Sequence, residues 1–119
     1  MQMAQEIPIV LISPGDGEKI PPERGVEFVW TGTGLKGPYS LKIAEMKAGQ
    51  SPEQAIMVNR AFFEKTGIAT TSFRCQSEET KFIPLRKYAW IIASGHSDAS
   101  RPRSFYIGAG EIFNKPLRK

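Results

Sequence analysis

The sequence has little of what builds a covalent or metal-bound site: it holds one cysteine and one histidine in 119 residues. The single cysteine, Cys75, cannot form a disulfide within the chain, so a scaffold held by its own disulfides is excluded. Its neighbours have strand-like character, and we expect a small buried hydrophobic residue rather than a reactive thiol. A zinc site needs further ligands, which the sequence does not cluster around the single histidine, His96.

The chain also lacks long apolar runs and dense charge. No stretch approaches the roughly 18 apolar residues of a membrane-spanning helix, and the first residues have neither the basic nor the apolar region of a signal peptide. The 16 basic and 12 acidic residues give a net charge of +4, and the basic ones concentrate only at residues 101–103 and 115–119. Nucleic-acid binding usually needs a denser basic stripe. It is kept only as a third alternative, through the tail at 115–119.

Catalytic signatures are equally sparse. His96, Ser97 and Asp98 are adjacent, but nucleophilic catalysis needs a base within reach of the nucleophile and a third group that orients the base. A turn after a strand already accounts for Ser97 and Asp98. Three glycines within residues 32–37 match the spacing of a phosphate-binding loop, but they precede a predicted strand instead of a helix. We therefore expect a protein that is not an enzyme and uses no cofactor or metal.

What the chain does have is a succession of short β-patterned segments. The most apolar is residues 82–94, FIPLRKYAWIIAS, which predicts a central strand buried on both faces. A tyrosine at the start of such a strand predicts a tyrosine corner, in which the hydroxyl bonds to backbone a few residues upstream. Its larger side chains alternate with a second set: Tyr88, Trp90 and Ile92 against Ala89, Ile91 and Ala93.

The second set should face outward in a two-sheet sandwich, where polar residues are expected. We expect the face formed by Ala89, Ile91 and Ala93 to be covered, by a helix predicted at residues 51–59, by the C-terminal segment, or by a partner domain. Cover from within the chain is favoured, because exposed apolar patches are rare in soluble monomers.

Other segments alternate in the same way. Two have clear inward faces, formed by Val26, Phe28 and Trp30 and by Tyr39, Leu41 and Ile43. One of Phe62 and Phe63 should point outward, as Tyr106 should. The further predicted strands are residues 7–12, 26–31, 39–46, 62–65, 69–75 and 104–107, with turn residues between them.

One short helix interrupts the strands. Ser51 is placed as its N-cap, Pro52 at its first position and Gln54 at the capping-box position, which predicts a helix over about residues 53–59. About seven strands and one inserted helix over roughly 100 residues are typical of an all-β, immunoglobulin-like sandwich of two sheets. We expect this single domain at residues 7–108, with residues 1–6 and 109–119 as flexible tails or linkers.

Several motifs occur in a characteristic order. They are the proline-flanked first strand at residues 9–17, the core residues Trp30 and Tyr39, and the series Phe82, Pro84 and Tyr88. In this order they resemble the fibronectin type III superfamily, particularly its bacterial envelope and exported members. The chain departs from that pattern at Phe82, which replaces the usual Leu, at Leu85, where a turn Gly is common, and in the extra helix.

The resemblance implies a non-catalytic structural or protein-interaction module. It implies an extracellular, periplasmic or cell-envelope location within a larger protein or assembly, with the cytoplasm left open. Partners would be another protein or neighbouring domains. We expect binding by strand addition to a sheet edge or through the loop of residues 95–103, because binding residues concentrate on loops held by a rigid scaffold. Its candidate side chains are His96, Asp98, Arg101 and Arg103.

The main alternative is a carbohydrate-binding module that recognises a polysaccharide. Sugar platforms use exposed aromatic rings, and Tyr106 is the candidate ring.

Overall fold

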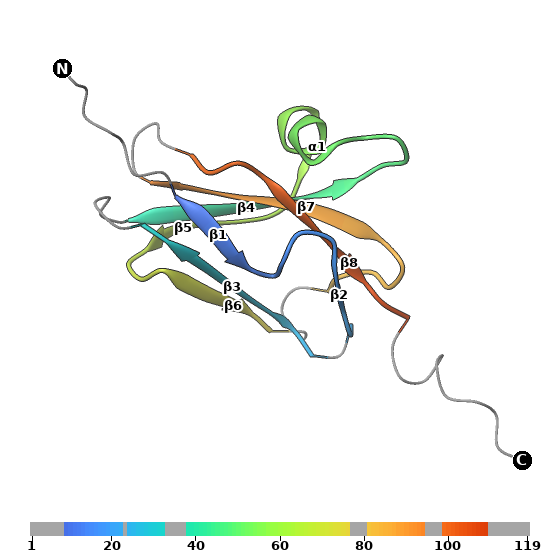
Figure 1. Cartoon of the computed structure of the whole chain (residues 1–119), viewed down its shortest axis with the longest axis horizontal. Coiled ribbons are helices and arrows are strands. Elements are labelled where there is room, and N and C mark those ends of the chain that lie inside the picture. The colour runs from blue at the N-terminus through green and yellow to red at the C-terminus, as the bar shows by residue number, and fades with distance from the viewer. Residues whose placement is uncertain (1–8, 23, 33–37, 77–80, 95–98, 110–119) are drawn as a thin grey trace, which may run out of the picture.

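The computed structural model describes residues 9–22, 24–32, 38–76, 81–94 and 99–109, which form eight strands and one helix (Figure 1). The predicted all-β class is confirmed. The elements are β1 (Val10–Ser13), β2 (Glu18–Ile20), β3 (Val26–Thr31), β4 (Tyr39–Met46), α1 (Pro52–Val58), β5 (Ala61–Ile68), β6 (Ser72–Cys75), β7 (Lys87–Ser94) and β8 (Arg103–Ile107).

The strands form two sheets that pack face to face. One sheet has the order β1-β3-β6, and the other has the order β2-β8-β7-β4-β5. Neighbouring strands are antiparallel except β2 and β8, which run parallel. Phe28 of the first sheet meets Trp90 of the second edge to face, with ring centroids 4.7 Å apart. The core therefore lies between two layers, as expected for a β-sandwich.

The alternation in the sequence decides which side chains enter this core. The inward residues predicted on β3 and β4 are all buried, as are Phe105 and Ile107 of β8. Cys75 is also buried, as predicted. Trp30 and Trp90 are fully enclosed, and neither indole N–H has a hydrogen-bond partner within the described residues.

The predicted tyrosine corner is present before β7. The hydroxyl oxygen of Tyr88 accepts a hydrogen bond from the backbone N–H of Ile83 at 2.9 Å. The ring of Phe82 packs edge-on against Tyr88 at 5.0 Å. Leu85, in the turn between Phe82 and β7, has a φ of 69°. This left-handed conformation explains why glycine suits the position.

The predicted helix also forms where its capping residues place it. Ser51 Oγ accepts from the Gln54 N–H at 3.2 Å, and Gln54 Oε1 accepts from the Ser51 N–H at 2.9 Å. The helix packs on the outer face of the five-stranded sheet through Ala55, which meets Ala44 and Ala89 in a fully buried cluster. The cover expected for the apolar face of β7 thus comes from within the chain at Ala89, whereas Ile91 and Ala93 are half-buried.

Several details differ from the sequence-based expectation; strand β6, for example, begins at Ser72 instead of residue 69. The described residues contain eight strands instead of seven, because Glu18–Ile20 adds parallel to β8. Strand β5 continues beyond its predicted end to Ile68, because Gly67 (φ 71°) permits an irregularity at which the strand bends without ending. The expectation that either Phe62 or Phe63 points outward is wrong. The register with β4 shifts between Phe63 and Ala61, so both rings pack against the core.

Of the predicted tails, residues 1–6 and 110–119 lie outside the described residues. Within the described ranges, no helix is long and apolar enough to cross a membrane.

Candidate functional site

The predicted binding loop is described only in its second half. His96 and Asp98 lie outside the described residues. Ala99 bridges to Ala93 of β7. The Ser100 N–H donates to the Ile92 carbonyl at 2.8 Å, and Ser100 Oγ accepts from the Ile92 N–H at 3.1 Å. Residues 99–103 are therefore an extended segment held along the edge of β7.

The first strand creates a groove beside this segment. After β1 the chain leaves the three-stranded sheet at Pro14 and joins the other sheet as β2. Strand β2 pairs with the last three residues of β8, in a register that runs from Glu18↔Phe105 to Ile20↔Ile107. Within the described residues, β1 is paired on one side only, with β3. Among the described residues, the crossing thus closes this side of the sandwich at β2, and no strand lies between β1 and residues 99–103.

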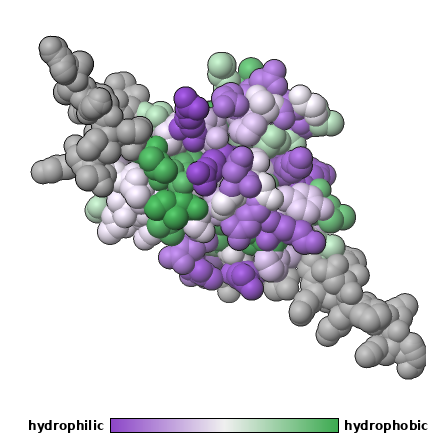
Figure 2. Space-filling view, in the orientation of Figure 1, coloured by the Kyte–Doolittle hydropathy of each residue, from purple (hydrophilic) through white to green (hydrophobic). Residues whose placement is uncertain are grey.

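We call this opening the first-strand groove. It has a volume of about 560 Å³, and its walls are residues 9–11 on one side and 99–103 on the other, with Asp16 and Glu53 beside them. Val10 and Ile12 of β1 are 46% and 49% exposed. Figure 2 shows an apolar patch at the place that β1 occupies in Figure 1, with hydrophilic side chains next to it.

The first-strand groove is lined by two basic and two acidic side chains. Arg101 is exposed and Arg103 is half-buried, and neither guanidinium forms an ion pair with a described residue. The carboxylate of Asp16 already accepts from the Ser104 N–H at 3.0 Å, which ties the turn after β1 to β8. Glu53 lies in the first turn of α1. The lining therefore carries two positive and two negative charges beside an apolar strand, with no excess of either sign.

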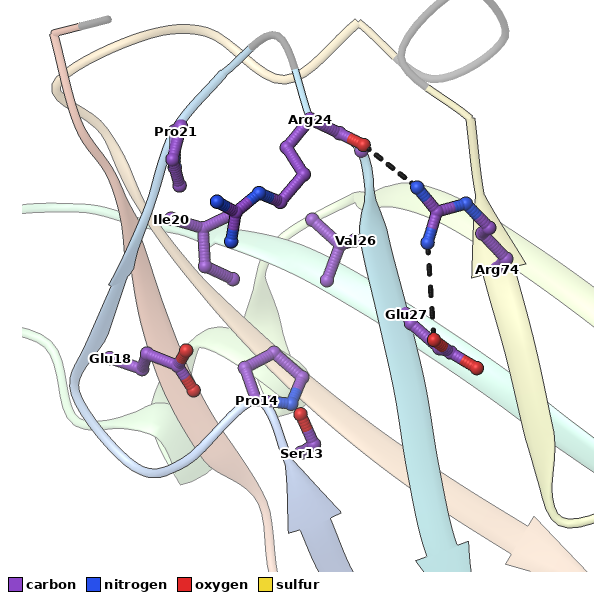
Figure 3. A pocket seen from close by; sticks show the side chains of 10 residues that line it. Ser13, Pro14, Glu18, Ile20, Pro21, Arg24, Val26, Glu27 and Arg74 are labelled. Atoms are coloured by element: carbon purple, nitrogen blue, oxygen red, sulfur yellow. Dashed lines mark hydrogen bonds and ion pairs between the residues drawn. The ribbon is translucent and has the colours of Figure 1, made fainter.

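A second, smaller pocket of about 220 Å³ lies at the other end of β1 (Figure 3). Its charged groups serve the local fold. The guanidinium of Arg74 donates a hydrogen bond from Nη2 to the Arg24 carbonyl oxygen at 3.0 Å. Its Nη1 lies 3.9 Å from the carboxylate Oε1 of Glu27. Glu18 accepts from the Gly15 N–H at 2.7 Å. The side chain of Arg24 extends over Ile20 in Figure 3. No nucleophile and base are paired in this pocket, whose described residues stabilise the turns around β2.

Tyr106, the candidate sugar-binding ring, is half-buried on the outer face of the five-stranded sheet. It borders a shallow depression of about 310 Å³ with Lys87 and Ser104. This depression shares no lining residue with the first-strand groove, and Tyr106 is therefore not in one site with Arg101 and Arg103.

Sequence reasoning missed the part of the site that β1 contributes. Residues 9–12 read Ile-Val-Leu-Ile, with no polar residue at the alternate positions. Apolar residues at the outward positions of β7 led us to expect that its outer face is covered. The same reasoning applied to β1 predicts that Val10 and Ile12 form an apolar outer face. No group of three or more potential metal ligands occurs among the described residues.

Comparison with known proteins adds no assignment: no family model, curated protein or solved structure matches the chain.

Proposed function

We propose that this chain is a non-catalytic protein-interaction module with a fibronectin type III-like architecture, working within a larger exported or cell-envelope assembly. The strand order supports the architecture. In immunoglobulin-like sandwiches the first, second and fifth strands share one sheet, and the third, sixth and seventh share the other. With the short β2 set aside, these correspond here to β1, β3 and β6 in one sheet and to β4, β7 and β8 in the other. The location rests on the sequence resemblance alone.

The observation that carries the interaction role is the first-strand groove. It combines an exposed apolar edge strand with two arginines that have no partner among the described residues. Exposed apolar patches of soluble proteins are commonly contact sites for partners. Both walls are held by sheet hydrogen bonds, so the surface is preorganised and little conformational entropy is lost on binding.

Site-specific photo-crosslinking tests this role. A photoreactive amino acid placed at Val10, and in a matched chain at exposed Lys65 on the opposite side of the sandwich, is introduced in the source cells. We expect position 10 to cross-link to one defined protein of the envelope or medium, and position 65 to give less of that product. Equal products at both positions, or none at either, would contradict an interaction role for this face.

A carbohydrate-binding module is the second candidate, and the depression beside Tyr106 is the observation in its favour. Stacking of a sugar on the Tyr106 ring predicts that Tyr106→Ala abolishes binding of cell-wall glycan fragments. Flat calorimetric titrations of the unaltered chain with such fragments would remove this candidate.

A further inference from the structure

Three neighbouring strands place one aromatic ring between two lysines on the outer face of the five-stranded sheet. Tyr106 of β8 stands directly opposite Lys19 of β2 on one side and Lys87 of β7 on the other. Directly opposite residues share a face of a sheet. This face is the outer one, because Phe105 and Ile107 on either side of Tyr106 are buried in the core. Both lysines are exposed, and we call the three side chains the tyrosine–lysine row.

The depression described above adjoins this row. It has a volume of about 310 Å³, and its lining includes the Tyr106 ring, the Lys87 side chain and Ser104. Gly17 also lines it and contributes no side chain that would fill it. A ring that borders an open depression offers a surface on which a sugar can stack.

The positive charge of the row is not offset at the outward positions around it. Among the described residues, neither Lys19 nor Lys87 forms an ion pair. On β4 the row continues with Met46, which stands opposite Lys87. The adjacent row on the same face consists of uncharged residues, which are Ser104, Ala89 and Ala44.

The carboxylates of this region are directed to other contacts. Glu18 of β2 and Glu45 of β4 stand opposite core residues and so belong to the inner face, where Glu45 is in an ion pair. Asp16, in the turn before β2, accepts from a backbone N–H of β8 at 3.0 Å. Glu53 of α1 lines the first-strand groove. The row therefore differs from that groove, whose lining holds as many acidic as basic side chains.

We propose that the tyrosine–lysine row binds an acidic polysaccharide, with one sugar stacked on Tyr106 and the carboxylates of its neighbours paired with Lys19 and Lys87. This inference rests on the sugar-binding candidate and specifies its ligand class. Strands of a sheet lie about 4.8 Å apart, so the two lysines leave the backbone roughly 10 Å apart, one on each side of the ring. A chain of sugars laid across the strands passes from one lysine over the ring to the other. A neutral sugar gains nothing from two cations.

A nucleic-acid strand fits the row less well. Its successive bases stack on several aromatic side chains. Among the described outward positions of β2, β8, β7 and β4, Tyr106 is the single aromatic residue. One ring between two cations therefore favours a sugar chain.

Two oligosaccharides that differ in charge alone test the ligand class. We titrate the full chain with the linear hexamer of galacturonic acid and with its methyl ester, which keeps the rings and removes the charges. Calorimetry should show binding of the acid form and about tenfold weaker binding of the ester, because two exposed charge pairs are lost. Added salt should weaken binding of the acid form and leave binding of the ester unchanged.

Variants of the chain locate the contacts. Lys19→Gln with Lys87→Gln should weaken the acid hexamer about tenfold and leave the ester unchanged, at an unaltered thermal midpoint. The matched control, Arg60→Gln with Lys65→Gln, removes the same charge from exposed residues at the far edge of the sheet and should change neither. Tyr106→Ala should abolish binding of both hexamers, whereas Tyr106→Phe keeps the ring and should preserve it.

Amide chemical shifts decide between the outcomes. Shift changes confined to residues 17–19, 86–88 and 104–107 on addition of the acid hexamer support the proposal, and binding with changes elsewhere overturns the row as the site. Equal binding of acid and ester at the row overturns the acidic class, while the sugar-binding candidate stands. Absence of binding by both hexamers overturns the inference and that candidate, and leaves the interaction role to the cross-linking at position 10. Tighter binding of oligothymidylate at the row would identify a nucleic-acid ligand and overturn the polysaccharide.

Discussion

The hydroxyl group of Tyr88 accepts a hydrogen bond from the backbone N–H of Ile83 across the turn that precedes β7, with the two atoms 2.9 Å apart. The same ring stacks on Phe105 of β8, with centroids 5.6 Å apart. A single side chain thus joins the turn to the core of the five-stranded sheet.

Removing that hydroxyl should destabilise the fold without emptying the core. In Tyr88→Phe the N–H of Ile83 loses its partner in a part-buried position, and we expect the free energy of unfolding to fall by about 1–2 kcal/mol. Urea denaturation monitored by tryptophan fluorescence measures this change. Tyr106→Phe is the control, since the Tyr106 hydroxyl makes no hydrogen bond with a described residue. A loss of equal size there would contradict the role of the corner.

The same residue predicts how stability depends on alkaline pH. Burial raises the pKa of Tyr88 above its ordinary value of 10.0, and the hydrogen bond from Ile83 opposes this only in part. The folded chain therefore keeps its proton to higher pH than the unfolded chain does. The stabilisation that comes from the neutral Tyr88 hydroxyl is complete below about pH 10, and it is lost as the pH rises through the pKa of Tyr88 in the folded chain.

Urea midpoints of the unaltered chain and of Tyr88→Phe, compared from pH 8 to pH 11, test this dependence. The difference between them should shrink at the alkaline end. A constant difference would mean that the tyrosine does not titrate differently in the folded and unfolded chains.

Leu85 is a site where a smaller residue should improve the fold. Its φ of 69° is unfavourable for a side chain with a Cβ, and the side chain is 61% exposed, so little packing is lost on its removal. We expect Leu85→Gly to stabilise the protein by about 1 kcal/mol, after the greater flexibility of glycine in the unfolded chain is subtracted. Thermal unfolding measures the gain. Leu85→Ala, which removes most of the side chain but keeps the strain, should give no stabilisation.

The contact between α1 and the sheet depends on small side chains. Ala89 meets Ala44 and Ala55 with no exposed surface, so a larger side chain at this position has no room. We expect Ala89→Leu to cost about 1–3 kcal/mol and to loosen the helix. A helix of seven residues depends on tertiary contacts, and proteolysis beside exposed Met57 should therefore become faster. Ala48→Leu, at an exposed position in the connection before the helix, should have neither effect.

The sequence predicted the elements whose patterns are local. The bounds of β3 and β4 follow from strict alternation between core and surface residues, and the start of α1 follows from Ser51 and Gln54. Strand β2 was not predicted from the sequence, because three residues are too few for a periodic pattern and because its partner, β8, lies more than eighty residues away. The inward placement of both Phe62 and Phe63 depends on a register shift against β4, which composition does not encode.

The candidate site was predictable in one half only. Arg101 and Arg103 stand in a loop that sequence reasoning singles out. Their neighbours Val10 and Ile12 join them only because the first strand changes sheets, a relationship between segments some ninety residues apart. Each wall has its own local signal, and the groove exists only in the folded chain.

The crossing of the first strand also determines how the domain responds to tension. Because β2 and β8 run parallel, a force that draws the beginning and the end of the fold apart slides these strands past each other along their length. The hydrogen bonds of Gly17 to Ser104 and of Gly108 to Ile20, 2.9 and 2.8 Å long, lie at the two ends of this short ladder and are loaded together. Resistance to stretching therefore resides at the junction that closes the sandwich. Strand β1 lies between the pulled beginning of the fold and β2, so it carries the same load as this ladder.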